Sequence, residues 1–163
     1  HCAQAIMTAI VDVQGFKTEA NEFIIKEIAI LCDKKIQVFL IKPPFPFYNL
    51  TKQERRQVSW IERNRKIHWN EGIVPYSNYQ NLVINILRDK CVYVKGSEKV
   101  SWLRNIVNST NVNNLEDKGC PSLLNLYKEY ENSHDLYSCI NHDSVCALKN
   151  VFCLNKWRID NVV

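Results

Sequence analysis

The sequence contains no apolar run near the roughly 20 residues that a helix needs to cross a membrane. It also lacks an internal repeat and a low-complexity linker, and its start, His1-Cys2-Ala3-Gln4, is not a targeting signal. These absences predict one domain over residues 1–163 with no membrane partner. Because the first residue is not methionine, we expect this domain to come from a longer chain.

Cysteine spacing and net charge limit the cellular location and the kinds of partner that we expect. The seven cysteines are an odd number without the regular spacing of a disulfide framework, so we expect reduced thiols and an intracellular location, in the cytoplasm, the nucleus or both. The formal net charge of +4 permits an anionic partner without requiring one. At 163 residues the chain can bury an ordinary core, so a metal would add stability to the fold rather than create it.

One imidazole, two thiols and a distant carboxylate form a candidate metal site. His142 and Cys146 are four residues apart, which places both on one side of a helix start, and Cys139 lies three residues earlier. These three side chains can supply three corners of a tetrahedral zinc site. Glu27 is the candidate for the fourth, because it lies in an apolar strand where an unpaired carboxylate would cost several kcal/mol.

Other interpretations of these four residues stay open. Glu27 could pair with an Arg or Lys, or lie at a strand end where it reaches water. His142 could be a core histidine near unrelated buried thiols.

Hydrophobic periodicity predicts an α/β fold with a mixed sheet. Three antiparallel strands come first, and Asp12 and Gln14 share one face of the first strand. A strand that returns after a helix usually lies parallel to its neighbour through a right-handed crossover. The expected strands are residues 6–13, 23–31, 36–41 and 91–96 with a short fifth one before Leu115, and Glu27 should share a face with Phe23, Ile25, Ala29 and Leu31. The expected helices are residues 51–65, 78–89, one from Ser97, 123–130, and one from Ser144 with an apolar side of Val145, Leu148, Phe152 and Trp157.

The densest basic segment is the helix that a capping box, Thr51-Lys52-Gln53-Glu54, should begin. A basic helix with aromatic neighbours can follow a nucleic-acid backbone, although a solvated helix face has the same composition. If the domain binds single-stranded RNA, we expect stacking on Trp60 or Trp69, whichever is exposed, and phosphate contacts through Lys52, Arg55, Arg56, Arg63 and Arg65. A protein partner would dock at the aromatic, proline-rich loop of residues 43–48.

The element order resembles the ribonuclease H-like fold of the DEDD exonucleases. The segment Ile10-Val11-Asp12-Val13-Gln14-Gly15-Phe16 resembles the first exonuclease motif, and residues 24–30 the strand that follows. Residues 91–103 resemble the second motif, and residues 115–123 the approach to the third. The resemblance implies a two-metal nuclease site built from four acids.

The acids themselves are mostly replaced. Gln14 stands at the second acid, Lys99 (or Glu98, with a slip of one residue) at the third, and Cys146 near the fourth. An amide, an ammonium and a thiol cannot hold two Mg²⁺ ions as carboxylates do, so Asp12 is the only residual catalytic candidate.

The order Glu27, Cys139, His142, Cys146 resembles the Glu-Cys-His-Cys zinc set of the Maelstrom domain, although the gap from His142 to Cys146 is shorter here. That domain belongs to the same fold and has lost its acids. The resemblance implies structural zinc, RNA binding, RNA cleavage without a metal, and a role in piRNA-linked transposon silencing.

We therefore expect a catalytically degenerate, zinc-stabilised domain that binds RNA or a protein partner. The alternatives are an active 3′→5′ nuclease, in which Asp12 with Glu98 or Glu116 holds one Mg²⁺, and a pure protein-interaction module.

Overall fold

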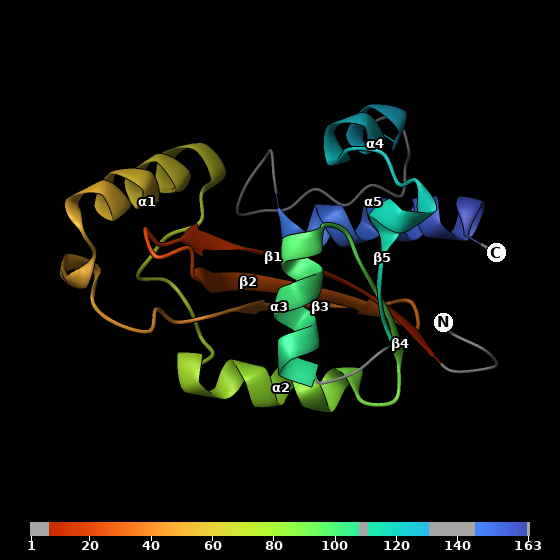
Figure 1. Ribbon diagram of the computed structural model, residues 1–163, viewed down its shortest axis with the longest axis horizontal. Helices are drawn as coiled ribbons and strands as arrows, with labels where there is room; N and C mark the ends of the chain where they lie inside the picture. Colours follow the sequence, from red (N-terminus) through yellow and green to blue (C-terminus); the bar gives the residue numbers. More distant parts are fainter. Residues whose placement is uncertain (1–6, 108–110, 131–145, 163) are drawn as a thin grey trace.

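Five strands form one mixed sheet in the order β3-β2-β1-β4-β5 (Figure 1). The computed structural model describes residues 7–107, 111–130 and 146–162. The strands are β1 (Thr8–Lys17), β2 (Phe23–Cys32), β3 (Lys35–Leu40), β4 (Cys91–Val94) and β5 (Val112–Asn114). Strands β1, β2 and β3 are antiparallel, whereas β4 lies parallel to β1 and β5 parallel to β4. The predicted α/β fold with a ribonuclease H-like mixed sheet is confirmed.

Helices cover both faces of this sheet (Figure 1). Helices α2 (Tyr79–Leu87) and α3 (Ser97–Val107) pack on one face, and α4 (Leu123–Tyr130) and α5 (Ala147–Asn161) on the other. Helix α1 (Lys52–Arg65) lies at the end of the sheet formed by the last residues of β1 and the first of β2, and begins with the predicted capping box. Short 3-10 turns are η1 (Phe47–Asn49), η2 (Tyr76–Asn78) and η3 (Leu115–Lys118). Among the described residues, no helix is long and apolar enough to cross a membrane.

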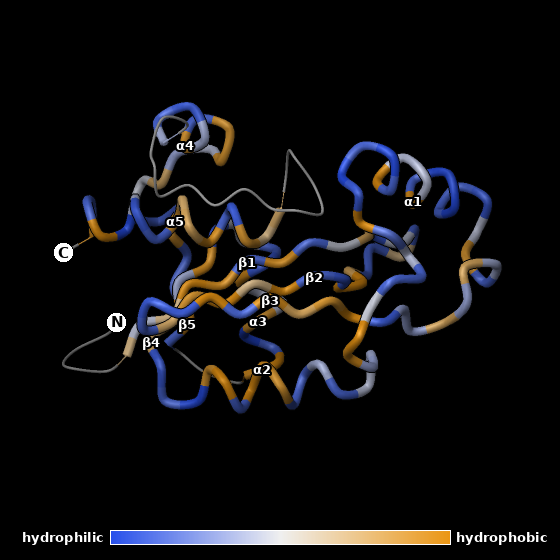
Figure 2. Tube along the Cα trace, turned by 180° about the vertical axis from the view of Figure 1, so that it is seen from behind, coloured by the Kyte–Doolittle hydropathy of each residue, from blue (hydrophilic) through white to orange (hydrophobic). Residues whose placement is uncertain are grey.

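Apolar side chains separate into a core on each face, and hydrophobic residues recur along the central strands and the helices in Figure 2. Val11 and Ile28 join the core beneath α2 and α3. Ile10 and Ala29, the neighbouring positions on the same strands, join the core beneath α4 and α5. The alternation of one strand between two cores explains why β1 and β2 are apolar on both faces.

A β-bulge at Lys26 decides which face Glu27 occupies. Gln14 pairs with Glu27 and Gly15 with Ile25, so Lys26 is an extra residue in β2. Gly15 permits this close pairing, since an added Cβ would lie 2.0 Å from the carbonyl oxygen of Ile24. The extra residue reverses the side-chain alternation along β2. The prediction that Glu27 shares a face with Ala29 and Leu31 is confirmed, but for Phe23 and Ile25 it is wrong, because both join the core beneath α2 and α3.

Among the described cysteines, one differs from the sequence expectation. Cys91 is disulfide-bonded, so the prediction of reduced thiols is wrong there. The other four described cysteines, Cys32, Cys120, Cys146 and Cys153, form no disulfide bond. Burial raises the pKa of the Cys120 and Cys153 thiols to about 11, which keeps both protonated and unreactive at neutral pH.

Candidate functional site

Asp12 lies at the centre of a buried polar cluster on the face of β1 that α5 covers. The Lys99 ammonium donates to Asp12 Oδ1 at 2.7 Å. The Asn150 amide donates to Asp12 Oδ2 at 2.7 Å, and the Gln14 amide donates to the same oxygen at 3.2 Å. The predicted common face of Asp12 and Gln14 is thereby confirmed. Strand β1 and helices α3 and α5 each contribute to this cluster.

The cluster neutralises a carboxylate instead of gathering several. Asp12 is 1% exposed, and both its oxygens already accept hydrogen bonds from N–H donors. Lys99 therefore occupies the position beside Asp12 that a cation would need, and its positive charge repels a divalent ion. Such an arrangement can stabilise the fold, but it supplies few oxygen ligands for a metal ion.

The two acids proposed as partners for Asp12 form ion pairs elsewhere. Glu98 pairs with Lys17 at 2.9 Å, and Glu116 pairs with Lys95 at 3.2 Å. Within residues 7–107, 111–130 and 146–162, no group of three or more His, Cys, Asp and Glu side chains could hold a metal ion. Of the two positions considered for the third acid, Lys99 is the one that contacts Asp12.

Asn150 is the member of the cluster that the sequence did not reveal. It is fully buried in α5, one helical turn after Cys146, and its Oδ1 accepts a hydrogen bond from the Tyr127 hydroxyl. Burial, and then the charge of Asp12, raise the pKa of Tyr127, so its hydroxyl remains a donor. Asn150 is the residue of α5 that contacts Asp12, whereas Cys146, expected near the fourth acid position, caps the helix one turn earlier. The available signal was a polar residue between Ala147 and Val151 on an apolar helix face.

Glu27 and Cys146 meet at the N-terminus of α5. Glu27 Oε1 accepts a hydrogen bond from the backbone N–H of Ala147 at 2.8 Å, across 120 residues of sequence. Cys146 has an extended backbone, caps the helix, and accepts from the Lys149 N–H at 3.2 Å through Sγ. Both side chains are buried, at 3% and 0% exposure. Two of the four predicted zinc ligands therefore come together, whereas Cys139 and His142 lie outside the described residues.

The two side chains of this pair are of types that bind zinc. A carboxylate oxygen and a thiolate sulfur are both zinc ligands. The chemistry of Glu27 and Cys146 thus fits half of a tetrahedral zinc shell.

Helix α5 turns a different side to the core from the one predicted. Its buried residues are Ala147, Asn150, Val151, Cys153, Leu154 and Trp157. Leu148 and Phe152 are only half-buried, so the predicted apolar side is wrong at both positions and confirmed at Trp157. The described helix begins at Ala147, not at Ser144. Ser144 and Val145 lie outside the described residues.

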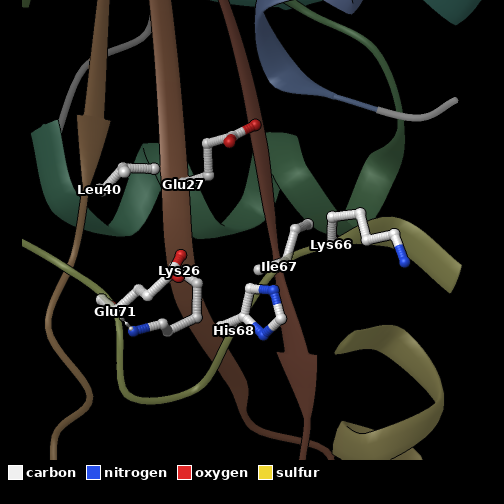
Figure 3. A pocket seen from close by; sticks show the side chains of 7 residues that line it. All are labelled: Lys26, Glu27, Leu40, Lys66, Ile67, His68 and Glu71. Carbon is white, nitrogen blue, oxygen red and sulfur yellow. Dashed lines mark hydrogen bonds between the residues drawn. The ribbon is translucent and has the colours of Figure 1, made fainter. Parts of the chain in front are cut away.

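Lys26 and Glu27 are sequence neighbours but point away from each other, as Figure 3 shows. The Lys26 ammonium donates to the backbone carbonyls of Ile41, Trp69 and Glu71 at 2.5, 2.7 and 2.6 Å. It therefore holds the loop after α1 against the sheet and is not the basic partner of Glu27. The cavity between them is only about 20 Å³, room for a single water.

Some basic side chains of the predicted RNA surface on α1 are exposed to solvent, and others contact neighbouring groups of the protein. Lys52, Arg56 and Arg63 are exposed. The Arg55 guanidinium donates to the carbonyl oxygen of Leu50 at 2.7 Å, which fixes the end of the proline-rich loop. The Arg65 guanidinium lies 5.8 Å from the centre of the Trp60 ring.

The two candidate stacking residues differ in accessibility. Trp60 is 49% exposed, so its ring is available. Trp69 is 1% exposed and packs against Phe16 and Phe45, which excludes it as a stacking surface.

Compared with protein-family models and with curated proteins, the chain gives no match. The family resemblance of its sequence therefore stays a prediction.

Proposed function

We propose that this chain is a catalytically degenerate ribonuclease H-like domain that binds single-stranded RNA without two-metal cleavage. The observation that carries this proposal is the hydrogen bonding of Asp12, whose two oxygens are held by Lys99, Asn150 and Gln14. Two-metal hydrolysis needs clustered carboxylates, and here an ammonium and two amides surround a single acid. A role in piRNA-type transposon silencing is what the resemblance to the Maelstrom domain adds to the proposal.

The exposed side of α1 supports the RNA-binding half of the proposal. Lys52, Arg56 and Arg63 are spaced by four and seven residues, which places them on one stripe of the helix. Trp60 lies beside this stripe and exposes about half its surface. Basic side chains neutralise phosphates and an exposed indole stacks on an unpaired base, so the stripe combines the two interactions that a single strand needs.

In the same proposal, Glu27, Cys139, His142 and Cys146 hold a structural zinc ion. The position of Glu27 beside the cap of α5 supports the first and last of these ligands. The ion would link strand β2 to helix α5, which packs against it.

The experiment measures the affinity of the chain for a labelled single-stranded RNA at several salt concentrations. The parent is compared with the double variant Arg56→Gln/Arg63→Gln. A matched control, Lys118→Gln/Lys128→Gln, removes two exposed charges from η3 and α4, away from α1 in Figure 1. Affinity decreases with salt, and each phosphate contact on a single strand adds about 0.7 to the steepness of the plot of log affinity against log salt. We therefore expect the plot to be shallower by about 1.4 in the α1 variant, and to change less in the control.

Two outcomes would contradict the proposal in different ways. RNA binding with an equal slope in the parent and the α1 variant would place the surface elsewhere on the chain. Absence of binding at low salt would favour a protein partner instead.

A further inference from the structure

A groove of about 460 Å³ lies between α5 and the end of the sheet where β2 turns into β3. Its apolar lining comes from Met7, Leu31, Ile36, Phe152 and Ile159. The end of the sheet where β2 turns into β3 is opposite α1 (Figure 1), and the groove residues Phe152 and Asn155 follow Asn150 on α5.

The groove exists because α5 does not cover the edge of the sheet. The buried side of α5 packs on β1 and β2, and its flank with Phe152 and Ile159 faces outward beside β3. Val38 lies on the same sheet face as Leu31 and is 40% exposed, while Ile159 is 63% exposed. Strand β3 is an edge strand. An apolar surface of this kind, beside an open strand edge, is typical of an interaction site.

The rim of the groove carries charges of both signs within a short distance along the chain. Asp33 and Lys34 are adjacent in the exposed β2–β3 turn, and Arg158 comes from α5. A partner with charge of one sign would be repelled by part of this rim. A second copy of the same surface, turned about a twofold axis, can oppose its Asp33 to Arg158 and its Arg158 to Asp33.

We propose that two copies of this chain associate through the groove between α5 and β3. Ile159 of each copy packs into the apolar lining of the other, and Asp33 and Arg158 pair at the rim. The contact is isologous, so it closes as a dimer and leaves the stripe of α1 on each copy free for RNA.

The test is sedimentation velocity of the full chain over a range of concentrations. We expect the parent to reach the mass of two chains. Ile159→Glu, which places a charge in the apolar contact, should raise the dimer dissociation constant at least about tenfold. Leu124→Glu is the matched control, because Leu124 is 62% exposed on α4 and lies outside the groove. This control should dimerise as the parent does.

Two further variants keep the test sharp if Ile159→Glu lowers the folded fraction. Met7→Glu changes a 48% exposed residue of the groove and should weaken the dimer in the same way. Asp33→Asn removes only a rim charge, at a positive φ that asparagine also adopts, and should raise the dissociation constant about two- to fivefold. A parent that stays at the mass of one chain at its highest concentration, or groove variants that dimerise as well as Leu124→Glu, would overturn the proposal. A small ligand or another protein would then be the occupant of the groove.

Discussion

At the scale of single residues, the contacts of Asp12 explain how neighbouring side chains stabilise a buried carboxylate. A buried carboxylate is costly unless it is paired and hydrogen-bonded. Lys99 supplies the opposite charge, and Asn150 and Gln14 supply the remaining donors. Among the described residues, Asp12 is therefore paired and hydrogen-bonded by these side chains.

Lys99→Met tests that pairing. We expect it to lower the free energy of unfolding by about 3 kcal/mol, because it leaves Asp12 charged and buried without its ammonium. The double variant Asp12→Asn/Lys99→Met should recover at least half of this loss, since it removes the isolated charge. Urea unfolding of the parent, both single variants and the double variant gives the coupling energy. Strictly additive losses would show that the two side chains do not support each other.

Lys26 gives a prediction about pH. Burial lowers its pKa from 10.5 to about 8, against the opposing charges of Glu71 and Glu62. Between pH 8 and 10.5 the unfolded chain therefore binds more protons than the folded one, and the free energy of unfolding rises with pH through this window. The full rise from this group is about 3 kcal/mol.

The measurement compares urea unfolding of the parent and of Lys26→Met across that window. Titrating tyrosines and cysteines contribute to both proteins, so the difference between the two curves isolates Lys26. We expect the free energy of unfolding of the parent, minus that of Lys26→Met, to increase as the pH rises toward 10.5. A constant difference would mean that the ammonium keeps its ordinary pKa in the folded chain.

At the scale of elements, the sequence was sufficient wherever a local signal exists. The capping box at Thr51 predicts the start of α1, and apolar runs predict β1 to β4. The short β5 lies in the polar segment before Leu115 where a fifth strand was expected. The β-bulge at Lys26 was not predicted, because its cause is the approach of Gly15 to Ile24 on a neighbouring strand. Periodicity alone assigns faces by counting residues, so one extra residue misplaced Phe23 and Ile25.

The candidate site shows the same division. Glu27 was recognisable as a buried acid, and strand alternation placed Asp12 and Gln14 on one face. The interpretation of Gln14 and Lys99 as replaced acids depends on the family resemblance and stays a prediction. Asn150 was not recognisable, because its contact with Asp12 spans 138 residues and depends on which side α5 turns to the sheet. Cys146 looked like a helical residue, whereas its extended backbone makes it the cap.

The cap of α5 carries the zinc prediction. Purified chain should contain about one zinc ion, and Cys146→Ser should lower the zinc content markedly, since a hydroxyl is a poor substitute for a thiolate ligand. Cys153→Ser is the matched control, because Cys153 is equally buried in the same helix but lies roughly 10 Å farther along it. Both variants should lose stability, so metal analysis of the folded protein is the deciding measurement. Equal zinc content in the two variants, or a parent that folds without metal, would refute the zinc site.

At the scale of the whole molecule, three sites with different chemistry lie at different places on the fold. The basic stripe lies on α1, the neutralised cluster lies between β1 and α5, and the apolar groove lies between α5 and β3. The net charge of +4 permits an anionic partner, and the exposed basic residues of α1 lie on the same helix as Trp60. In the proposed function, α1 holds a strand of RNA while the Asp12 cluster serves only stability.

The most direct test of this claim incubates an end-labelled single-stranded RNA with enough chain to bind all of it, in the presence of Mg²⁺ or Mn²⁺. Bound and total RNA are resolved on native and denaturing gels from the same samples. We predict that the RNA is bound and remains at full length with either metal, because the described side chains that contact Asp12 are Lys99, Asn150 and Gln14 and not a second carboxylate. Shortening of the RNA from its 3′ end that requires the metal and disappears in Asp12→Asn would contradict the proposed function and establish an active nuclease.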